Sequence, residues 1–463
     1  MTDTLTCISP VDGSVYAERP LAGTAEIDAA VTAAAAAQHD WRHMPIAERA
    51  AICGRFVDAF TADSGRIAEE LAWQMGRPVG QGPGEVAGVD ERARHMIAIA
   101  AEALADIDAG AKEGFHRFVR RQPLGVVLTV APWNYPYQTA VNSIVPALMA
   151  GNAVILKPSA QTPLTAERFA DAFAAAGLPV GLFQTLYLSH GETERLIDHD
   201  EIAFVNFTGS VAAGHAIQGA AAGRFIGVGL ELGGKDPAYV RPDADLDHAV
   251  ESLVDGAFFN SGQSCCGIER IYVHADCYDA FVDGFAALTE AYRLGHPLEA
   301  ETNLGPVVRP AAAEFVRGQV ADAVRDGARA LVDPARFPAD AAGSAYLAPQ
   351  VVVDVDHRMR LMTEESFGPV VGIMKVDSDA AAVALMNDSD FGLTASIWTA
   401  DKAAAIALGD EVETGTWYMN RCDYLDPALA WTGVKDSGRG CTLSRVGYEQ
   451  LTRPKSFHLR TAV

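Results

Sequence analysis

Hydrophobic residues in the middle of the chain recur in short runs that alternate with alanine-rich stretches. The runs are GVVLTV, AVILKPS, FQTLYL, FVNFTGS and IGVGLEL, which begin at residues 125, 153, 183, 204 and 226. β-branched runs separated by helical stretches at this spacing predict a parallel sheet covered by helices on both faces. Because crossover connections between parallel strands are right-handed, we expect a doubly wound α/β domain.

The parts of the chain before and after this region have other patterns. The first 105 or so residues look mainly helical, with a run of alanines at 29–37 and apolar residues at helical spacing over 47–71. After residue 233 the alternation starts again, with helices expected from about Leu246 and Tyr278 and strands expected near 269–273, 348–353 and 370–375. We therefore predict a second α/β domain.

Two short β-prone segments have no obvious partner strand in sequence. They are HRFVRR at 116–121 and SFHLRTAV at 456–463. Unpaired strand edges promote aggregation, so we expect these segments to pair with each other or with a second subunit.

Composition narrows the class of protein. A chain of 463 residues, 49% hydrophobic and 21% charged, predicts a globular protein of two or three domains. The 36 basic and 60 acidic residues give a formal charge of -24, which argues against nucleic acid or an anionic membrane surface as a partner. Any anionic cofactor must therefore bind at a site where the local charge is positive.

The sequence also indicates a compartment. It opens with MTDTLTCISP, which lacks the features of a secretory signal, and its most apolar stretch, 140–156, is interrupted by polar residues. The 7 cysteines do not form the paired spacing of a zinc site or the density of a disulfide scaffold. We expect reduced thiols, no metal centre and a cytoplasmic protein.

Cys265 ends the segment FNSGQSC and precedes a second cysteine, Cys266. The glycine in this segment allows the backbone to bring a thiol against a ligand, and a helical segment expected to follow can lower the thiol's pKa. The alternative is a small buried cysteine without a chemical role. The segment alone leaves both possibilities open.

Glu231 and Asn134 follow predicted strands. A carboxylate at the end of the apolar run GLELGGK is costly to bury, which fits either a general base or a partner of a buried cation. Asn134, in PWNYP, offers an uncharged donor for an oxyanion, although this segment also fits a simple turn between two prolines.

Other strand ends fit a phosphate-bearing ligand. Gly209, Ser210 and Gly214 follow FVNFTGS and begin a helix whose backbone N–H groups could bind a pyrophosphate, although the spacing is GSxxxG and not GxGxxG. Lys157 lies at the carboxyl edge of a predicted strand, where open α/β sheets bind ligands, or is an ordinary exposed lysine.

Seven motifs in this order closely resemble the aldehyde dehydrogenase superfamily, from about residue 10 to the carboxyl end. They are PWNYP, ILKPS, FTGS, LELGGK, FNSGQSC, EESFGPV and GVKDSGRG. The resemblance implies oxidation of an aldehyde to a carboxylic acid with NAD or NADP. Cys265 matches the nucleophile that forms a thiohemiacetal and then a thioester, Asn134 matches the oxyanion donor, and Glu231 matches the base that activates water for hydrolysis.

The resemblance also implies a cofactor site and a domain plan. The positions that match the cofactor site are Pro132, Trp133, Lys157, Ser159, Ala160, Gly209, Ser210, Leu232, Glu365 and Phe367. The family fold predicts an NAD(P)-binding domain of residues 1–107 and 124–231, a catalytic domain of residues 232–448, and oligomerisation strands at 108–123 and 449–463. A homodimer or homotetramer is expected.

Two alternatives to this function follow from the same resemblance. The nearer is a CoA-dependent acylating aldehyde dehydrogenase, and Glu231 argues against it because that branch typically lacks a carboxylate there. The more distant is a catalytically silent relative that serves as a binding or structural protein. The presence of Cys265, Glu231 and Asn134 together favours an active, hydrolytic enzyme.

The substrate and the cofactor preference are less well defined by the sequence. Ala160 stands where many NAD-preferring relatives carry a glutamate, so use of both cofactors is expected. Candidate substrate contacts are Tyr135, Asn142, Asp423 and Leu425. Relatives that oxidise short semialdehydes often carry an arginine where this chain has Asn142. The acidic and aromatic residues therefore favour an uncharged or cationic aldehyde, unless Asp423 only caps a turn and the rings are packing. Arg421 could also neutralise Asp423 or itself anchor a carboxylate.

Overall fold

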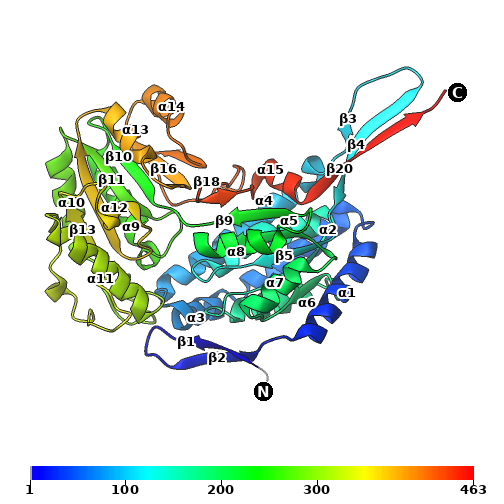
Figure 1. The fold of residues 1–463 in the computed structure, drawn as a ribbon, viewed down its shortest axis with the longest axis horizontal. Coiled ribbons are helices and arrows are strands. Elements are labelled where there is room, and N and C mark those ends of the chain that lie inside the picture. Colours follow the sequence, from blue (N-terminus) through cyan, green and yellow to red (C-terminus); the bar gives the residue numbers. More distant parts are fainter. Residues whose placement is uncertain (1–2, 463) are drawn as a thin grey trace.

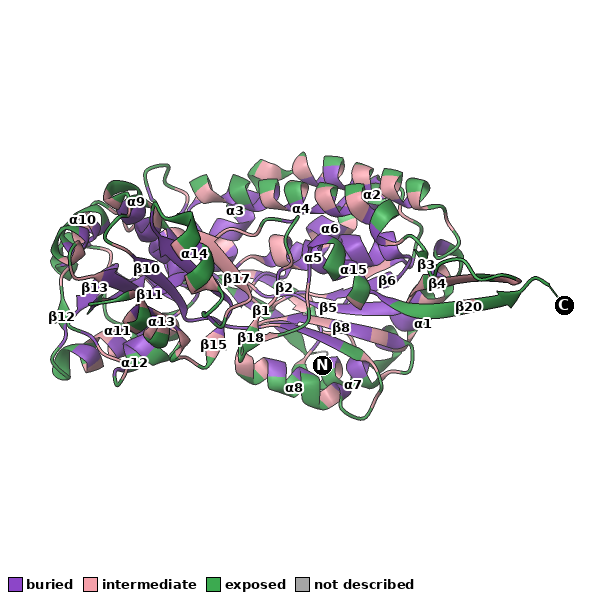
Figure 2. Cartoon of the chain, turned by 90° about the horizontal axis from the view of Figure 1, so that it is seen from above, coloured by how far each residue is buried: buried purple, intermediate pink, exposed green. Residues whose placement is uncertain are grey.

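Two parallel sheets and a projecting arm organise the chain (Figure 1). The computed structural model describes residues 3–462. Figure 2 shows that the strands of both sheets lie inside the molecule, whereas the helices outside them turn exposed faces to solvent. Within this part of the chain, no helix has the length and apolar character needed to cross a membrane.

The first sheet has the strand order β19-β9-β8-β5-β6-β7, in which β5 to β9 are parallel. Its elements are β5 (Val126–Val130), α5 (Pro136–Ala150), β6 (Ala153–Lys157), α6 (Leu164–Ala175), β7 (Phe183–Thr185), α7 (His190–Asp198), β8 (Ile202–Thr208), α8 (Val211–Ala221) and β9 (Gly227–Glu231). β5 is buried at every position, which explains its continuous hydrophobic run. The predicted doubly wound fold is confirmed.

The strand order of this sheet locates a ligand site. The chain moves outward from β5 through β6 to β7 and then returns to place β8 on the other side of β5. Ligands of open α/β sheets bind outside the carboxyl ends of strands where the order reverses in this way. PWNYP follows β5, Lys157 ends β6, Gly209 follows β8 and Glu231 ends β9, so these predicted site residues share one edge of the sheet.

Helices cover both faces of the first sheet. The amino-terminal part consists of β1 (Thr4–Ile8), β2 (Val15–Pro20), α1 (Thr24–Trp41), α2 (Ile46–Thr61), α3 (Ser64–Met75), the 3₁₀ turn η1 (Val79–Gln81) and α4 (Gly82–Ala103). In Figure 2, α2, α4, α5 and α6 lie on one side of the strands, and α7 and α8 lie on the other. The helical prediction for this part omitted one feature. β1 and β2 form an antiparallel hairpin, whose turn contains Gly13 at a φ of 76°.

The second sheet has the order β12-β13-β14-β11-β10-β16-β17, and only β12 runs antiparallel to its neighbour. Its strands and helices are β10 (Asp236–Val240), α9 (Leu246–Phe258), η2 (Phe259–Gly262), β11 (Ile268–His274), α10 (Tyr278–Glu290), α11 (Pro310–Arg325), β12 (Arg329–Ala330), η3 (Pro334–Arg336), β13 (Gln350–Val353), α12 (Arg360–Thr363), β14 (Val370–Val376), α13 (Asp379–Asn387), β16 (Thr394–Trp398), α14 (Lys402–Gly409) and β17 (Thr416–Met419). The expected elements at Leu246, 269–273, Tyr278 and 370–375 are present. The strand expected near 348–353 is shorter, since it begins at Gln350.

The segment after the second sheet returns to the first one. β15 (Phe391–Gly392) pairs with β18 (Val434–Lys435), β19 (Gly438–Arg439) pairs antiparallel with β9, and α15 (Ser444–Gln450) contacts α4 and α5. Trp431 and Tyr448 belong to the hydrophobic core of the first sheet. The last part of the segment predicted as the catalytic domain, residues 232–448, thus packs on the first sheet, a return that chain order alone does not reveal. The domain bounds themselves stay a prediction.

The arm consists of β3 (Ile107–Asp108), β4 (Phe115–Pro123) and β20 (Thr452–Arg460). β4 and β20 are antiparallel over nine residues each and extend away from the body of the molecule (Figure 1). The two β-prone segments thus pair with each other. The last residue of SFHLRTAV, Val463, lies outside the described residues.

Candidate functional site

A cavity of about 300 Å³ lies against Cys265. It is lined by residues from α4, from the start of α5, from the end of β9, from the segment 259–266 and from the loop 423–431. Five of the predicted site residues line it, namely Cys265, Glu231, Tyr135, Asp423 and Leu425. The fold thus brings together segments that are nearly 350 residues apart in the sequence.

The backbone before Cys265 has an unusual conformation. Asn260, Ser261 and Gly262 have φ angles of 53°, 57° and 70°, and a Cβ on Gly262 would lie 2.3 Å from the carbonyl oxygen of Gly368. Left-handed non-glycine residues persist only where their surroundings hold them, and they cluster at functional sites. The side chain of Gln263 supplies one restraint, since its Oε1 accepts a hydrogen bond of 2.7 Å from the backbone N–H of Val308.

Cys266, the residue after Cys265, has its thiol held by a hydrogen bond. Its thiol donates to Oδ1 of Asp423 at 2.9 Å, and the Ser264 hydroxyl donates to the same oxygen at 3.2 Å. A hydrogen bond with the Cys265 thiol, burial and the Asp423 carboxylate together raise the pKa of Cys266 well above its usual range. Burial raises the pKa of Asp423 to about 6. The Cys266 thiol therefore stays protonated and is a poor nucleophile.

Asn134 is buried next to the cavity-lining segment that precedes Cys265. Its Nδ2 donates to the backbone carbonyl of Gln263 at 3.1 Å. An asparagine amide has two N–H donors, so this bond orients the side chain and uses only one of them. The backbone carbonyl of Asn134 is in turn held by the guanidinium of Arg77.

Arg77 and Glu85 form a buried ion pair that supports this loop. The Nη1 of Arg77 lies 2.5 Å from Oε2 of Glu85, and the two side chains are 1% and 0% exposed. Oε1 of Glu85 accepts hydrogen bonds from the backbone N–H groups of Tyr137 and Gln138 at 2.9 and 3.0 Å, at the start of α5. The pair therefore ties α4 to the PWNYP loop, and a carboxylate at a helix start is favourable.

Glu231 ends β9 with its carboxylate held between two threonines. Its Oε1 accepts a hydrogen bond of 2.5 Å from Thr442, and its Oε2 accepts one of 3.4 Å from Thr208. Among residues 3–462 it forms no ion pair with a lysine or arginine. Burial raises the pKa of Glu231 above its ordinary value. A carboxylate with a raised pKa is suited to accept a proton near neutral pH.

The strand ends of the first sheet fit a dinucleotide. Ser210 caps α8 by accepting a hydrogen bond from the backbone N–H of Ala213 at 3.3 Å. A Cβ on Gly214 would lie 2.7 Å from the side chain of Leu232, so glycine is needed where α8 packs on β9. Lys157 has no carboxylate within ion-pairing distance in the described chain, and burial lowers its pKa. A partly buried cation at the carboxyl edge of the sheet is suited to an anionic ligand.

Further predicted cofactor residues lie around these strand ends. Pro132 and Trp133 follow β5, Ser159 accepts a hydrogen bond of 3.2 Å from the backbone N–H of Gln161, and Ala160 is exposed. The rings of Trp133 and Phe367 meet edge to face with centroids 5.5 Å apart. This contact joins the loop after β5 to the loop before β14.

Glu365 lies beside the two glycines that follow β9. It accepts a hydrogen bond of 2.9 Å from the backbone N–H of Gly234, and a Cβ on Gly233 would lie 2.6 Å from its carboxylate. Burial and the nearby Glu269 raise its pKa to about 8. Glu269 itself pairs with Lys235 and accepts hydrogen bonds from the backbone of Ser366 and Phe367. Among residues 3–462 Glu365 therefore has no cation of its own within ion-pairing distance, which suits a carboxylate that binds ligand hydroxyl groups.

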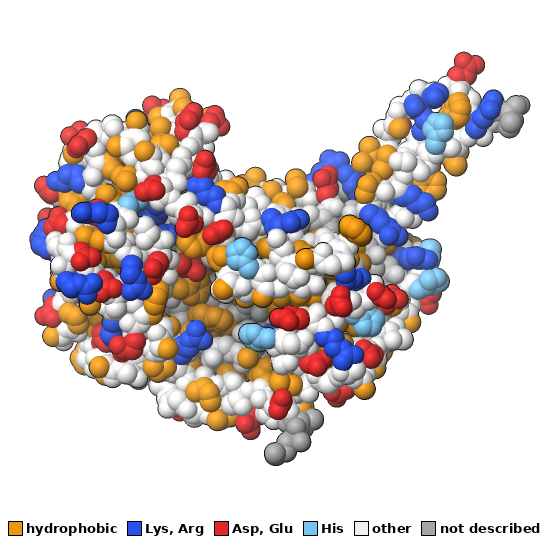
Figure 3. Space-filling model, viewed as in Figure 1, with side chains coloured by type: hydrophobic (Ala, Val, Ile, Leu, Met, Phe, Trp, Pro, Cys, Tyr) orange, Lys and Arg blue, Asp and Glu red, His pale blue; other side chains and the backbone are white. Residues whose placement is uncertain are grey.

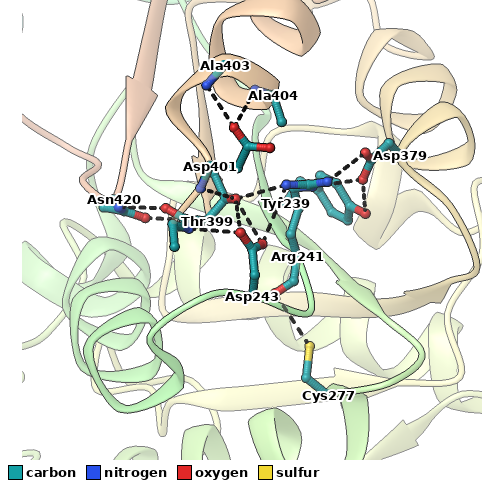
Figure 4. A network of polar contacts seen from close by, with 11 residues as sticks. Tyr239, Arg241, Asp243, Cys277, Asp379, Thr399, Asp401, Ala403, Ala404 and Asn420 are labelled. Carbon is teal, nitrogen blue, oxygen red and sulfur yellow. Dashed lines mark hydrogen bonds and ion pairs between the residues drawn. The ribbon is translucent and has the colours of Figure 1, made fainter.

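The loop at the mouth of the cavity begins at Asn420, where a polar network anchors it (Figure 4). The Asn420 side chain forms two hydrogen bonds of 2.9 Å with the backbone of Thr399. The Thr399 hydroxyl is held by Asp243 and by Arg241, and Arg241 makes a bidentate pair with Asp379 at 3.0 and 3.1 Å. The second sheet thus fixes the position from which Asp423 and Leu425 enter the cavity.

Asn142 is the predicted substrate residue that does not line the cavity. It is 2% exposed on α5, and no residue in the described part of the chain hydrogen-bonds its amide. The residues of α5 and its start that line the cavity are Tyr135, Gln138 and Thr139, about one turn earlier. The prediction that Asn142 contributes to a substrate wall stays a prediction.

Sequence reasoning missed Arg77, Glu85 and Arg92. Arg92 lines the cavity from α4 and is 6% exposed, and its one hydrogen bond within residues 3–462 goes from Nη1 to the carbonyl oxygen of Gln138 at 3.0 Å. Burial lowers its pKa. A charged residue on a buried helix face was the available signal, since arginine is rarely buried without a partner.

Comparisons with known proteins agree with this geometry. A model described as "Aldehyde dehydrogenase family" matches residues 1–457. The 3,6-anhydro-alpha-L-galactose dehydrogenase of Streptomyces coelicolor is 37% identical over 466 residues, which cover 99% of this chain and 94% of that enzyme. The NADP(+) succinate-semialdehyde dehydrogenase of Mycolicibacterium paratuberculosis is 36% identical over 452 residues, which cover 97% of this chain and 95% of that enzyme.

A solved structure supports the same assignment. The NADP-dependent glyceraldehyde-3-phosphate dehydrogenase from Bacillus halodurans, crystallised with NADP, superposes with a TM-score of 0.93 at 32% identity and covers 99% of this chain and 96% of that one. The family predicted from the seven motifs is thus confirmed. The chain belongs to the aldehyde dehydrogenase family and is an aldehyde-oxidising dehydrogenase.

Proposed function

We propose that this NAD(P)-dependent aldehyde dehydrogenase works through a covalent thioester on Cys265. The observation that carries the proposal is the shared cavity, in which Cys265 and Glu231 meet next to the oriented amide of Asn134. The Cys265 thiolate attacks the aldehyde carbon, so that a C–S bond forms and the carbonyl oxygen becomes an oxyanion. The free N–H of Asn134 and the backbone N–H of Cys265 stabilise that charge.

The cofactor residues of the first sheet fit NAD or NADP. The start of α8 and Lys157 would hold the phosphate and ribose groups, and Glu365 with Phe367 would hold the nicotinamide riboside. The bound dinucleotide supplies the acceptor for the hydride that leaves the substrate carbon. The edge-to-face contact of Trp133 with Phe367 keeps the two cofactor loops at a fixed separation.

Glu231 then releases the product. It takes a proton from water, the resulting hydroxide attacks the thioester carbon, and the C–S bond breaks to give the carboxylic acid and the Cys265 thiolate. The bonds from Thr442 and Thr208 hold the carboxylate for this step. A carboxylate at this position favours water over CoA as the acyl acceptor, which is the reason to prefer hydrolysis to the acylating alternative.

Arg92 suggests the class of substrate. The cavity contains two arginines, of which Arg77 is neutralised by Glu85. Arg92 has no carboxylate within 4.0 Å in the described structure, so a buried cation faces the cavity unpaired. Oδ1 of Asp423, the acid expected to attract a cationic aldehyde, is already engaged by Ser264 and Cys266. We therefore favour an aldehyde with a distal carboxylate, which agrees with the substrate named for the succinate-semialdehyde relative.

Three aldehydes of similar length test this assignment. The measurement is kcat/KM for succinate semialdehyde, butanal and 4-aminobutanal at one pH, for the wild type and for the variants Arg92→Met and Asp423→Asn. Succinate semialdehyde should be the best of the three, and Arg92→Met should lower its kcat/KM by about tenfold to a hundredfold while changing butanal little. If 4-aminobutanal is best and Asp423→Asn removes that preference, Asp423 sets the specificity and the assignment fails. An equal loss for all three substrates would show that Arg92 acts on the catalytic groups instead.

A further inference from the structure

A second cavity, of about 500 Å³, lies where the arm joins the body. Its basic side chains come from both parts of the molecule, Arg120, Arg121, Arg453 and Lys455 from the arm strands and Arg42 and Arg49 from α1–α2 of the body. In the part of the chain that the structure describes, no aspartate or glutamate lines it. Figure 3 shows Lys and Arg side chains gathered at the foot of the arm. In a chain of formal charge -24, a concentration of positive charge of this size is an exception.

Arg49 is the buried basic side chain of this cavity, and its charge has no partner in the described chain. It is 7% exposed, and its Nε and Nη1 are buried without a hydrogen-bond partner in the described chain. No ion pair of Arg49 occurs among residues 3–462. A buried guanidinium without a partner carries a large desolvation cost, so a stable protein keeps one only where another group compensates it.

The packing around Arg49 holds it in place. A Cβ on Gly151 would lie 2.6 Å from Nη1 of Arg49, so the glycine allows the guanidinium to lie against the end of α5. Gly151 has a φ of 95°, which also favours glycine. Burial lowers the pKa of Arg49, in agreement with its lack of a partner. The guanidinium is thus packed against the end of α5 and largely shielded from solvent.

The other cations around the cavity are only partly neutralised. Arg120 pairs with Asp106 at 2.9 Å and Arg121 with Glu449 at 3.5 Å, and both acids lie outside the lining. Arg42, Arg453 and Lys455 form no ion pair in the described structure. Several cations around one buried guanidinium match an anion with more than one charge and several acceptor oxygens.

We propose that this cavity is a binding site for a small phosphate anion, separate from the catalytic cavity. The phosphate oxygens accept hydrogen bonds from Arg49 in the body and from Arg453 or Lys455 in the arm, so the ligand contacts both parts at once. Inorganic phosphate and pyrophosphate are the simplest members of this class. The proposed site binds phosphate and catalyses no reaction, so its occupancy is measured by direct binding and not by enzyme activity.

The test uses the full-length protein and thermal unfolding. Phosphate or pyrophosphate should raise the Tm of the wild type by about 2 °C or more beyond sodium chloride at equal ionic strength, and calorimetry should give a saturable isotherm. Arg49→Met should lower the affinity at least tenfold. The same substitution should raise the Tm of the unliganded protein, because it removes an uncompensated buried charge. That opposite pair of shifts distinguishes a ligand site from a merely structural arginine.

Two more variants keep the test decisive. Arg453→Gln changes the cavity at the arm side and should weaken phosphate binding with little effect on folding. Arg325→Met, at an arginine 67% exposed on α11, is the matched control and should bind like the wild type. Equal shifts in chloride and phosphate, or an unchanged phosphate shift in Arg49→Met, would overturn the proposal. Absence of phosphate binding together with a change in the light-scattering mass of Arg49→Met would assign the cavity to a contact between subunits instead.

Discussion

The carboxylate of Asp423 accepts a hydrogen bond of 2.9 Å from the thiol of Cys266, the neighbour of the proposed nucleophile. This bond ties the mouth loop to the segment that carries Cys265. Two adjacent thiols consequently have different surroundings, since Cys266 is 3% exposed and Cys265 is partly exposed to the cavity. The difference supports different roles for the two thiols, with Cys265 as the nucleophile and Cys266 as a structural neighbour, which kinetics can test.

Cys265→Ala should abolish aldehyde oxidation, whereas Cys266→Ala should keep most of it. The first variant lacks the nucleophile, so we expect kcat to fall by about 10³-fold or more. The measurement is NAD(P)H formation, with circular dichroism as the control for folding. The reverse ranking, an inactive Cys266→Ala beside an active Cys265→Ala, would show that the roles are misassigned.

Glu231→Gln should stall the enzyme after the first half-reaction. The amide cannot accept the proton of water, so the thioester on Cys265 persists. Rapid mixing should show one burst of NAD(P)H per active site followed by slow turnover, and mass spectrometry should detect the acylated chain. Thr442→Val, which removes a 2.5 Å hydrogen bond to Glu231, should slow the same step less. Steady-state turnover of Glu231→Gln equal to that of the wild type would refute the role.

The prediction from sequence succeeded where local pattern decides the structure. Continuous hydrophobic runs such as β5 read as buried parallel strands, and the motifs located Cys265, Glu231 and Asn134 at strand ends or glycine-rich turns. It failed where distant segments meet. The return of β19 to β9 depends on tertiary packing, which no local pattern reveals. Tertiary packing also decides which turn of α5 lines the cavity, and Gln138 and Thr139 lie there about one turn before Asn142.

The buried ion pair of Arg77 and Glu85 could not be predicted from the sequence for a related reason. Arg77 lies between α3 and η1, and Glu85 lies on α4. Because the two residues do not belong to one helix or strand, their spacing of eight residues does not predict a contact. Only the fold brings them together under the PWNYP loop. Such a pair can be recognised by its partners, because both side chains also bond the backbone of residues 134–138.

Arg77→Met should reduce both stability and catalysis. Removing one partner leaves Glu85 charged and buried, which typically costs about 3–5 kcal/mol. Thermal unfolding should show a lowered Tm, and kcat should fall because the carbonyl of Asn134 loses its support. Arg358→Met, at an 89% exposed arginine paired with Asp356, is the control and should change either quantity little. A wild-type kcat in Arg77→Met would remove the positioning role from the pair.

Ala160→Glu should shift cofactor preference toward NAD. Ala160 is exposed three residues after Lys157, and a glutamate there would bind ribose hydroxyl groups and repel the 2′-phosphate of NADP. The ratio of kcat/KM for NAD over NADP should rise by about tenfold or more, equivalent to ~1.4 kcal/mol. Ala160→Gln is the matched control for charge. An unchanged ratio in the glutamate variant would place Ala160 away from the ribose.

Deleting residues 452–463 should prevent assembly of the proposed homodimer or homotetramer. The deletion removes β20, which leaves β4 with an open edge and exposes Phe118, whose ring stacks on Phe457 at 4.5 Å. Light scattering should find a larger assembly for the full-length chain and monomer or aggregate for the deletion. A full-length species of 49.0 kDa would contradict the proposed oligomer.

The pairing of β4 with β20 also sets an order of events during synthesis. β4 leaves the ribosome early, but its partner at 452–460 is translated more than 300 residues later. The strands of the first sheet up to β9 are complete long before that point and can begin to collapse as a unit. The arm is therefore formed after translation has passed residue 460, so a stalled or truncated nascent chain has no finished arm.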